Sequence, residues 1–147
     1  ELMAEAVEQN IPYALKFGVS LELDNPGEQV WGCLDPDRIL QVVSNLLSNA
    51  IKFSPADGVV TLRLRADESS ITVSVIDRGR GMSPEFLGRL FDRFSQEGHV
   101  GNGQASSGLG LAISKSIVEH HGGTIEVSSV VEAGTEFRVI LPKPKPA

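Results

Sequence analysis

The fold of this chain is decided by residues 35–53, which read DPDRILQVVSNLLSNAIKF. Asp35 suits the N-cap of a helix, Pro36 suits the first helical position, and Ser54-Pro55 follows the last helical residue. Apolar side chains recur every three or four positions and form a stripe that one helix face would bury. That stripe consists of Leu40, Val43, Leu47 and Ala50. The sequence therefore predicts a helix over 35–53 that packs on a hydrophobic core.

The periodicity on either side of this helix predicts further helices and mostly hairpin-linked strands. Helices are expected over 1–17, with a kink at Pro12, over 83–90, and over 109–121, which would end at Gly122. Strands are expected at 19–23, 30–34, 59–65, 71–76, 124–128 and 135–141. This order predicts one domain over 1–147 with an α/β (α+β) fold. It would be a two-layer sandwich in which about three helices cover one face of a mixed, mostly antiparallel sheet.

The segment 95–107 has neither a helical nor a strand pattern. It is dominated by Gly, Ser, Asn and Gln, and Val100 is its one large aliphatic residue. Irregular loops of this length in a compact domain are often functional. We expect 95–107 to be a lid over a binding site, and 142–147 to be a polar tail.

Composition excludes several classes of partner. The chain has 147 residues, a net charge of −6 and one cysteine, Cys33. The negative charge argues against nucleic acid or an anionic membrane as the main partner. A lone cysteine and the lack of an apolar run near the roughly 18 residues of a membrane span indicate a cytoplasmic domain. Because the chain begins inside an expected helix without a methionine, we expect a fragment of a longer protein, whose parent could be anchored in the inner membrane.

Polar residues on the central helix fall on one narrow stripe. Gln41, Asn45 and Asn49 recur every four positions, and Lys52 follows seven residues after Asn45. This spacing places them on one helix face. The stripe fits an ordinary solvated face. It also fits a site in which an amide oxygen binds a hard cation such as Mg²⁺ and the lysine binds anionic oxygen.

Two glycine-containing segments follow later in the chain. Asp77-Arg78-Gly79-Arg80-Gly81 comes directly after a strand, where it fits either a turn or a carboxylate that accepts from the exocyclic amine of adenine. Gly108-Leu109-Gly110-Leu111 opens the last long helix, where exposed backbone N–H groups can bind an anion. Neither a Rossmann nor a Walker motif is present. Each segment is ambiguous alone, but together with the polar stripe and the lid they are the parts of an ATP site.

In order and spacing, these segments resemble the ATPase domain family shared by histidine kinases, DNA gyrase, heat-shock chaperones of the ninety-kilodalton class and mismatch-repair ATPases. The resemblance covers roughly 35–142 and implies the ATP-binding Bergerat fold. Its motifs are an asparagine box at 45–53, a first glycine box at 77–82, a phenylalanine box at 90–94, a second glycine box at 108–113 and Gly134-Thr135-Glu136-Phe137.

The resemblance implies ATP and Mg²⁺ as cofactors and gives each matching residue a role. Asn45 would bind Mg²⁺, and Asn49 and Lys52 would contact phosphates. Asp77 would bind the adenine amine, with Thr135 acting through water. The remaining nucleotide contacts would come from Phe53, Gly79, Gly81, Met82, Phe91, Gly108, Leu109, Gly110 and Leu111. Arg93 would reach the nucleotide or the phosphoacceptor, and would join Asn45 and Lys52 in catalysis.

Gln41 distinguishes branches of the family. Hydrolytic members resemble one another in carrying a glutamate four residues before the magnesium asparagine, where this chain has Gln41. A glutamine cannot accept a proton at neutral pH, so activation of water should be poor. The resemblance is therefore to a protein-histidine kinase, in which the γ-phosphate passes to an imidazole.

None of the histidines here resembles the family's phosphoacceptor. His120 and His121 lie in the last turn of a helix, where they complement the helix dipole. The resemblance implies an acceptor on a helical dimerisation domain upstream of Glu1, relay to a response-regulator receiver domain, a monomeric fragment and a homodimeric parent.

Before Gly108, Ala105-Ser106-Ser107 departs from the Gly-Thr sequences of many relatives, so an inactive nucleotide-binding or interaction domain remains an alternative. A related serine kinase is another.

Overall fold

The computed structural model describes residues 2–25, 35–79 and 109–143. The elements in these ranges are α1 (Leu2–Phe17), β1 (Ser20–Asp24), α2 (Pro36–Phe53), β2 (Val59–Ala66), β3 (Ser70–Asp77), α4 (Leu109–His120), β4 (Thr124–Val130) and β5 (Gly134–Pro142). Each agrees within one residue at either end with a helix or strand expected from the sequence, except that β4 continues two residues past 128. Pro142, expected to open the tail, is the last residue of β5. The strand expected at 30–34, the helix at 83–90 and the lid at 95–107 lie outside the described residues.

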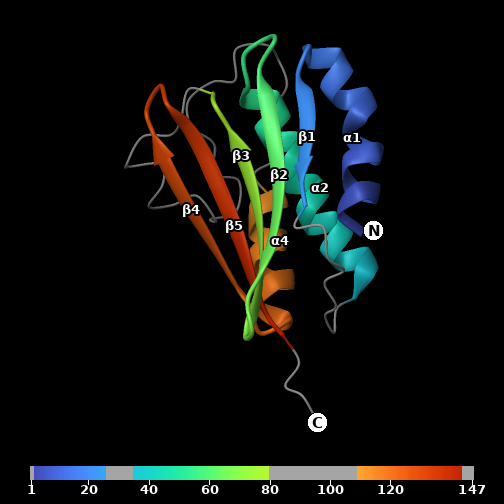
Figure 1. Cartoon of the computed structure of the whole chain (residues 1–147), viewed down its shortest axis with the longest axis vertical. Coiled ribbons are helices and arrows are strands. Elements are labelled where there is room, and N and C mark those ends of the chain that lie inside the picture. The colour runs from blue at the N-terminus through green and yellow to red at the C-terminus, as the bar shows by residue number, and fades with distance from the viewer. Residues whose placement is uncertain (1, 26–34, 80–108, 144–147) are drawn as a thin grey trace.

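The strands form one sheet in the order β1-β2-β3-β5-β4. The β1–β2 pair is parallel, and the other three pairs are antiparallel. Helices α1, α2 and α4 lie together on one face of this sheet (Figure 1). The expected two-layer sandwich with a mixed, mostly antiparallel sheet is therefore confirmed. None of the helices within the described ranges is long and apolar enough to cross a membrane.

Helix α2 lies at the centre of the helical layer. Asp35 caps it, since its Oδ1 accepts from the backbone N–H groups of Asp37 at 3.1 Å and Arg38 at 3.3 Å. Its buried face is wider than the expected stripe, because α2 contacts α1, α4 and the sheet at once. Leu40 from that stripe is only half-buried. The buried residues of α2 are Ile39, Val42, Val43, Leu46, Leu47, Ala50 and Ile51.

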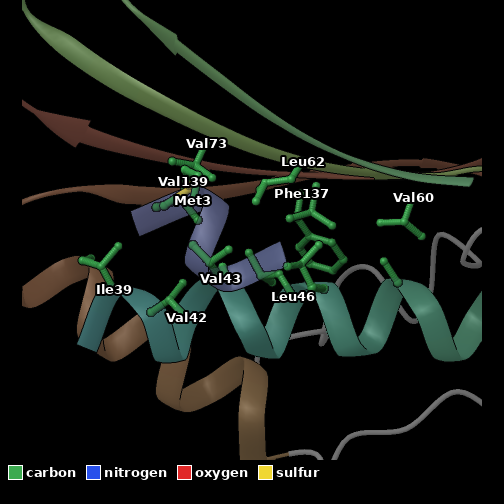
Figure 2. Packing of buried hydrophobic residues seen from close by; sticks show 14 of the residues in the cluster. Met3, Ile39, Val42, Val43, Leu46, Val60, Leu62, Val73, Phe137 and Val139 are labelled. Carbon is green, nitrogen blue, oxygen red and sulfur yellow. The ribbon is translucent and has the colours of Figure 1, made fainter. Parts of the chain in front are cut away.

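The core lies between α2 and the sheet, as Figure 2 shows. Alternate residues of the strands point toward the helices and are at most 5% exposed: Val60, Leu62, Ile71, Val73, Val75, Phe137, Val139 and Leu141. Such period-two burial is expected of a sheet that is covered on one face. The core extends along β3 as far as Asp77, so a carboxylate occupies the last inward-facing position of that strand.

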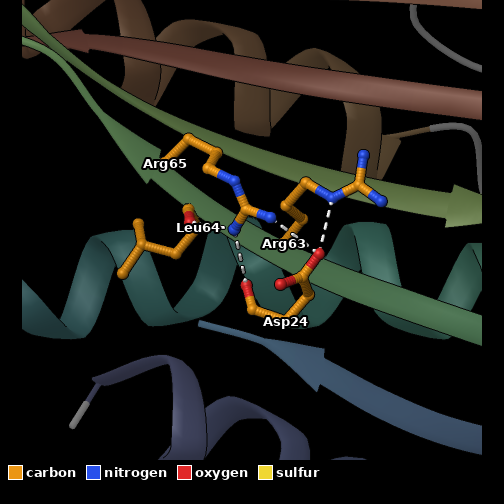
Figure 3. A network of polar contacts seen from close by, with 4 residues as sticks. All are labelled: Asp24, Arg63, Leu64 and Arg65. Carbon is orange, nitrogen blue, oxygen red and sulfur yellow. Dashed lines mark hydrogen bonds and ion pairs between the residues drawn. The ribbon is translucent and has the colours of Figure 1, made fainter. Parts of the chain in front are cut away.

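The opposite face of the sheet is polar. Asp24 at the end of β1 accepts from Arg63 Nε at 2.9 Å and from Arg65 at 2.9 Å, both on the neighbouring strand β2 (Figure 3). The hydrogen bonds from Arg63 and then Arg65 lower the pKa of Asp24. Exposed ion pairs of this kind contribute little to stability. They link the end of β1 to the neighbouring strand β2.

Candidate functional site

The polar stripe of α2 lies beside α4. Gln41 is exposed, whereas Asn45, Asn49 and Lys52 are half-buried. Asn45 donates a hydrogen bond from Nδ2 to Ser114 Oγ of α4 at 3.3 Å. The stripe therefore becomes more enclosed toward the C-terminal half of α2, where a bound anion would meet fewer competing waters.

The C-terminal end of α2 holds a partly desolvated cation. Burial lowers the pKa of Lys52. Its Nζ lies 5.7 Å from the centroid of the Phe53 ring, within range of a cation–π contact. A lysine that has lost part of its hydration binds anionic oxygen more strongly than a fully hydrated one. Lys52 is thus suited to contact a phosphate.

Asp77 is a buried carboxylate at the end of β3. It is 7% exposed, and its Oδ1 accepts from Gly79 N at 2.8 Å. Burial raises the pKa of Asp77, and this effect exceeds the lowering by backbone hydrogen bonds from Gly79 and Thr135. A carboxylate in this setting accepts strongly from any N–H that a ligand brings to it.

Gly79 joins this carboxylate to the end of α2. A Cβ at position 79 would collide with the carbonyl oxygen of Phe53 and come within 3.1 Å of Asp77 Oδ1. The chain after β3 can pass this close to α2 only because residue 79 has no side chain. The carboxylate of Asp77 is therefore held close to the backbone of Phe53 at the end of α2.

Thr135 lies beside Asp77 on the neighbouring strand β5. The two residues are paired in the β3–β5 ladder, and Thr135 is 7% exposed. Its Oγ1 lies 2.9 Å from Ser129 Oγ on β4. The preceding residue, Gly134, has a φ of 121°, and a Cβ there would collide with the carbonyl oxygen of Asp77. Glycine at 134 thus allows β5 to begin against the end of β3.

The start of α4 completes the described part of the site. Leu109 and Gly110 form its first turn, and Leu111 is half-buried against the core. Ser114, which contacts Asn45, lies four residues after Gly110, about 6 Å along the axis at 1.5 Å per residue. The first turn of α4 is therefore about one helical turn from the Asn45 contact. Gly81, Met82, Phe91, Arg93 and Gly108 lie outside the described residues.

Two hydroxyl groups of this region were not identified from the sequence. Ser114 is fully buried, and Ser129 is half-buried beside Thr135. The available signal for Ser114 is its spacing, since it lies in phase with Leu111 and Val118 on the apolar face of α4. No comparable signal marks Ser129.

The donor set fits a magnesium ion shared with a nucleotide. Within the ranges that the structure describes, no cluster of three or more His, Cys, Asp or Glu could hold a metal by itself. Mg²⁺ is commonly held by one or two protein oxygens together with substrate phosphates and water. The half-buried amide of Asn45, with Lys52 two turns further along α2, suits that arrangement.

The raised pKa of Asp77 leads to a prediction about stability. Asp77→Asn is expected to raise the free energy of unfolding of the unliganded domain at pH 7, because the amide carries no charge to desolvate. Stability linked to a raised pKa is fully present below the unfolded pKa and is lost as pH rises through the folded pKa. The gain should therefore shrink as pH falls through the raised pKa of the folded state and be absent below about pH 4. Urea unfolding of both proteins at pH 7 and below about pH 4 measures the change in unfolding free energy.

Asp67 provides a control of opposite sign. Backbone hydrogen bonds from Ser69 and Ser70 lower the pKa of this exposed carboxyl. Asp67→Asn should therefore lose stability at pH 7, and the loss should vanish at low pH. A gain for Asp77→Asn that is equal at both pH values would contradict the burial effect.

Comparison with known proteins defines the class of this domain. The chain belongs to the family of histidine kinase-, DNA gyrase B-, and HSP90-like ATPases, whose sequence profile matches residues 34–145. Over 144 residues it is 35% identical to the sensor protein KdpD of Clostridium acetobutylicum, an alignment that covers 97% of this chain and 16% of KdpD. The chain thus spans about a sixth of the length of that relative.

Solved structures narrow the resemblance to sensor kinases. The catalytic domain of the histidine kinase ThkA superposes with a TM-score of 0.83 at 25% identity, covering 97% of this chain and 92% of that one. Full-length ShkA in complex with AMPPNP superposes with a TM-score of 0.85 at 28% identity, covering 99% of this chain and 30% of that one. The chain is therefore similar in sequence and in fold to the catalytic domains of sensor histidine kinases.

Proposed function

We propose that this domain binds Mg-ATP and transfers the γ-phosphate to a histidine on a helical dimerisation domain of its parent protein. The observation that carries the proposal is that α2 contacts both neighbours, α4 through Asn45 and the Asp77 end of β3 through Gly79. The family and the similarity to histidine kinase catalytic domains support it. The nucleotide analogue named for ShkA supports ATP as the ligand.

The base would lie against Asp77. Its buried carboxylate would accept from the adenine amine, with Thr135 acting through a bridging water. Gly79, Gly81, Met82, Phe53 and Phe91 would border the base. Guanine presents a carbonyl where adenine presents an amine. The buried carboxylate of Asp77 would then face another acceptor and stay unpaired, which disfavours guanine.

The phosphates would lie between α2 and α4. Asn49 and Lys52 would contact their oxygens, while the amides of Gly108, Leu109 and Gly110, with Leu111 behind them, would complete an anion site at the helix start. Asn45 would supply a protein oxygen to Mg²⁺, which offsets phosphate charge when bound. Arg93 would reach the nucleotide or the phosphoacceptor. The chain's contribution is to hold the γ-phosphate in line with an imidazole.

Transfer rather than hydrolysis is favoured by Gln41. It is exposed on the face that carries Asn45, one turn earlier, and its amide cannot accept a proton from water at neutral pH. We expect this chain to hydrolyse ATP slowly and Gln41→Glu to raise the rate by about 100-fold, the low end of general-base effects. Phosphate release assays measure both. Rapid hydrolysis by the unsubstituted chain would contradict this interpretation.

The parent protein would supply the partners. The phosphorylated histidine would pass its phosphoryl group to an aspartate of a response-regulator receiver domain. The parent would be a homodimer with this domain on the cytoplasmic side, where ATP is available, whether or not it is anchored in the inner membrane.

Phosphotransfer can be tested by adding γ-labelled ATP to a protein that joins this chain to a histidine-bearing helical hairpin. The expected product is acid-labile and base-stable, as a phosphohistidine is. An acid-stable product would instead support a serine kinase. Nucleotide binding without any label would support an inactive domain.

A further inference from the structure

Ser114 lies at the contact between the two helices of the site. It is on the inward face of α4 and has no exposed surface. Its Oγ accepts the hydrogen bond from Asn45 Nδ2 at 3.3 Å. A serine inside a helix can donate its own O–H to the carbonyl one turn earlier, which leaves its oxygen to act as an acceptor. In the contact with Asn45, Oγ of Ser114 is the acceptor toward α2.

The side chain of Asn45 has two chemically different ends. Only Oδ1 can bind a cation, because the amide nitrogen has no lone pair to offer. Both ends belong to one rigid planar group, so a bond that holds Nδ2 also sets the direction of Oδ1. Loss of such a bond removes one restraint against the rotation of about 180° that exchanges the two ends.

We propose that Ser114 is a positioning residue that orients the Asn45 amide so that its oxygen, and not its nitrogen, faces the magnesium ion of a bound Mg-nucleotide. This inference rests on the proposed function, in which Asn45 is the metal ligand. Ser114 would act like the residues that hydrogen-bond to a metal ligand and fix its orientation in other metal sites. Loss of such a residue commonly costs 10- to 100-fold in metal affinity.

The same contact links the two phosphate-binding elements. Ser114 and the first turn of α4 belong to one continuous helix, and Asn45 and Lys52 to another. Ser114 therefore fixes the metal ligand relative to the backbone amides that would hold the phosphates. A shift of α4 would move both parts of the site together.

Ser114→Ala removes the acceptor without adding volume. We expect it to weaken the apparent affinity of the AMP-PNP complex for Mg²⁺ by about tenfold, while affinity for AMP-PNP in EDTA stays unchanged. Calorimetric titration of AMP-PNP across a series of Mg²⁺ concentrations measures both. Ser114→Thr keeps the hydroxyl and should restore the Mg²⁺ affinity. Ser114→Cys, similar in size but a weak acceptor, should behave like alanine. Ser116→Ala, on the exposed side of α4, is the matched control.

The outcomes separate this proposal from the function on which it rests. A weaker apparent Mg²⁺ affinity in Ser114→Ala and Ser114→Cys, with rescue in Ser114→Thr, supports the positioning role. Equal losses of AMP-PNP affinity with and without Mg²⁺ would indicate that Ser114 acts through packing, and would overturn the positioning role. If Asn45→Ala loses Mg²⁺ dependence and no Ser114 variant does, the positioning role alone is wrong. If Asn45→Ala also keeps it, the metal assignment itself is wrong.

Discussion

Asn45→Ala is expected to abolish the Mg²⁺-dependent part of ATP binding and to leave the fold intact. Asn45 is half-buried and lies outside the apolar face of α2, so its removal leaves the core intact, and loss of the hydrogen bond to Ser114 costs about 1 kcal/mol of unfolding free energy. Loss of a protein oxygen that binds the metal should reduce metal affinity more than loss of a residue that only orients a metal ligand, which costs 10- to 100-fold. We therefore expect affinity for ATP with Mg²⁺ to fall by about 100-fold or more.

Calorimetry with and without Mg²⁺ tests this expectation. In EDTA the variant and the unsubstituted chain should bind ATP similarly, because the base and phosphate contacts are unchanged. Gln41→Ala is the matched control, since it removes an exposed amide from the same helix face, one turn away. An Asn45→Ala variant with unchanged affinity in Mg²⁺ would refute the metal role.

Asp77→Asn is expected to change which purine the domain prefers. The carboxylate would accept from the adenine amine in a buried site, and a hydrogen bond to a charged group contributes about 1.5–3 kcal/mol. Replacing it by an amide that can present N–H to the adenine amine should lower ATP affinity by about 10- to 100-fold. Affinity for GTP should fall little or rise, because the amide can donate to the guanine carbonyl.

Titrations of both nucleotides in Mg²⁺ measure this change in preference. Asp67→Asn makes the same chemical substitution in the turn before β3, at the end of the strand far from Asp77, and should leave both affinities unchanged. Equal losses of ATP and GTP affinity in Asp77→Asn would show that Asp77 supports the fold of the site and does not distinguish the base.

Elements with strong local signals could be predicted from the sequence. Helix α2 carries a capping aspartate, a proline at its first position and a serine-proline at its end, and its bounds are those expected. The hairpin of β2 and β3 and that of β4 and β5 follow from alternating apolar residues. Asp77 could be singled out because this acidic residue, with glycines close behind it, comes directly after an apolar strand. Its burial becomes visible only in the fold.

Contacts between distant elements could not be predicted. Ser114 and Asn45 are 69 residues apart, and the sequence does not show that α4 packs beside α2. His121 was expected only to complement the end of a helix. In the structure its Nε2 accepts from Asp35 N at 3.1 Å, so Nδ1 carries the proton and donates to Ile117 O at 2.9 Å. His121 therefore lies at the end of α4, as expected, and it also links α4 to the start of α2.

We propose that α2, the Asp77 end of β3 and the start of α4 surround a single bound nucleotide. Titration of Mg-AMP-PNP into the ¹⁵N-labelled chain tests this arrangement. Amide resonances of Asn45, Gly79 and Gly110 should shift together and saturate with one dissociation constant. Shifts confined to one of these elements, or saturation at clearly different concentrations, would contradict a single Mg-nucleotide site.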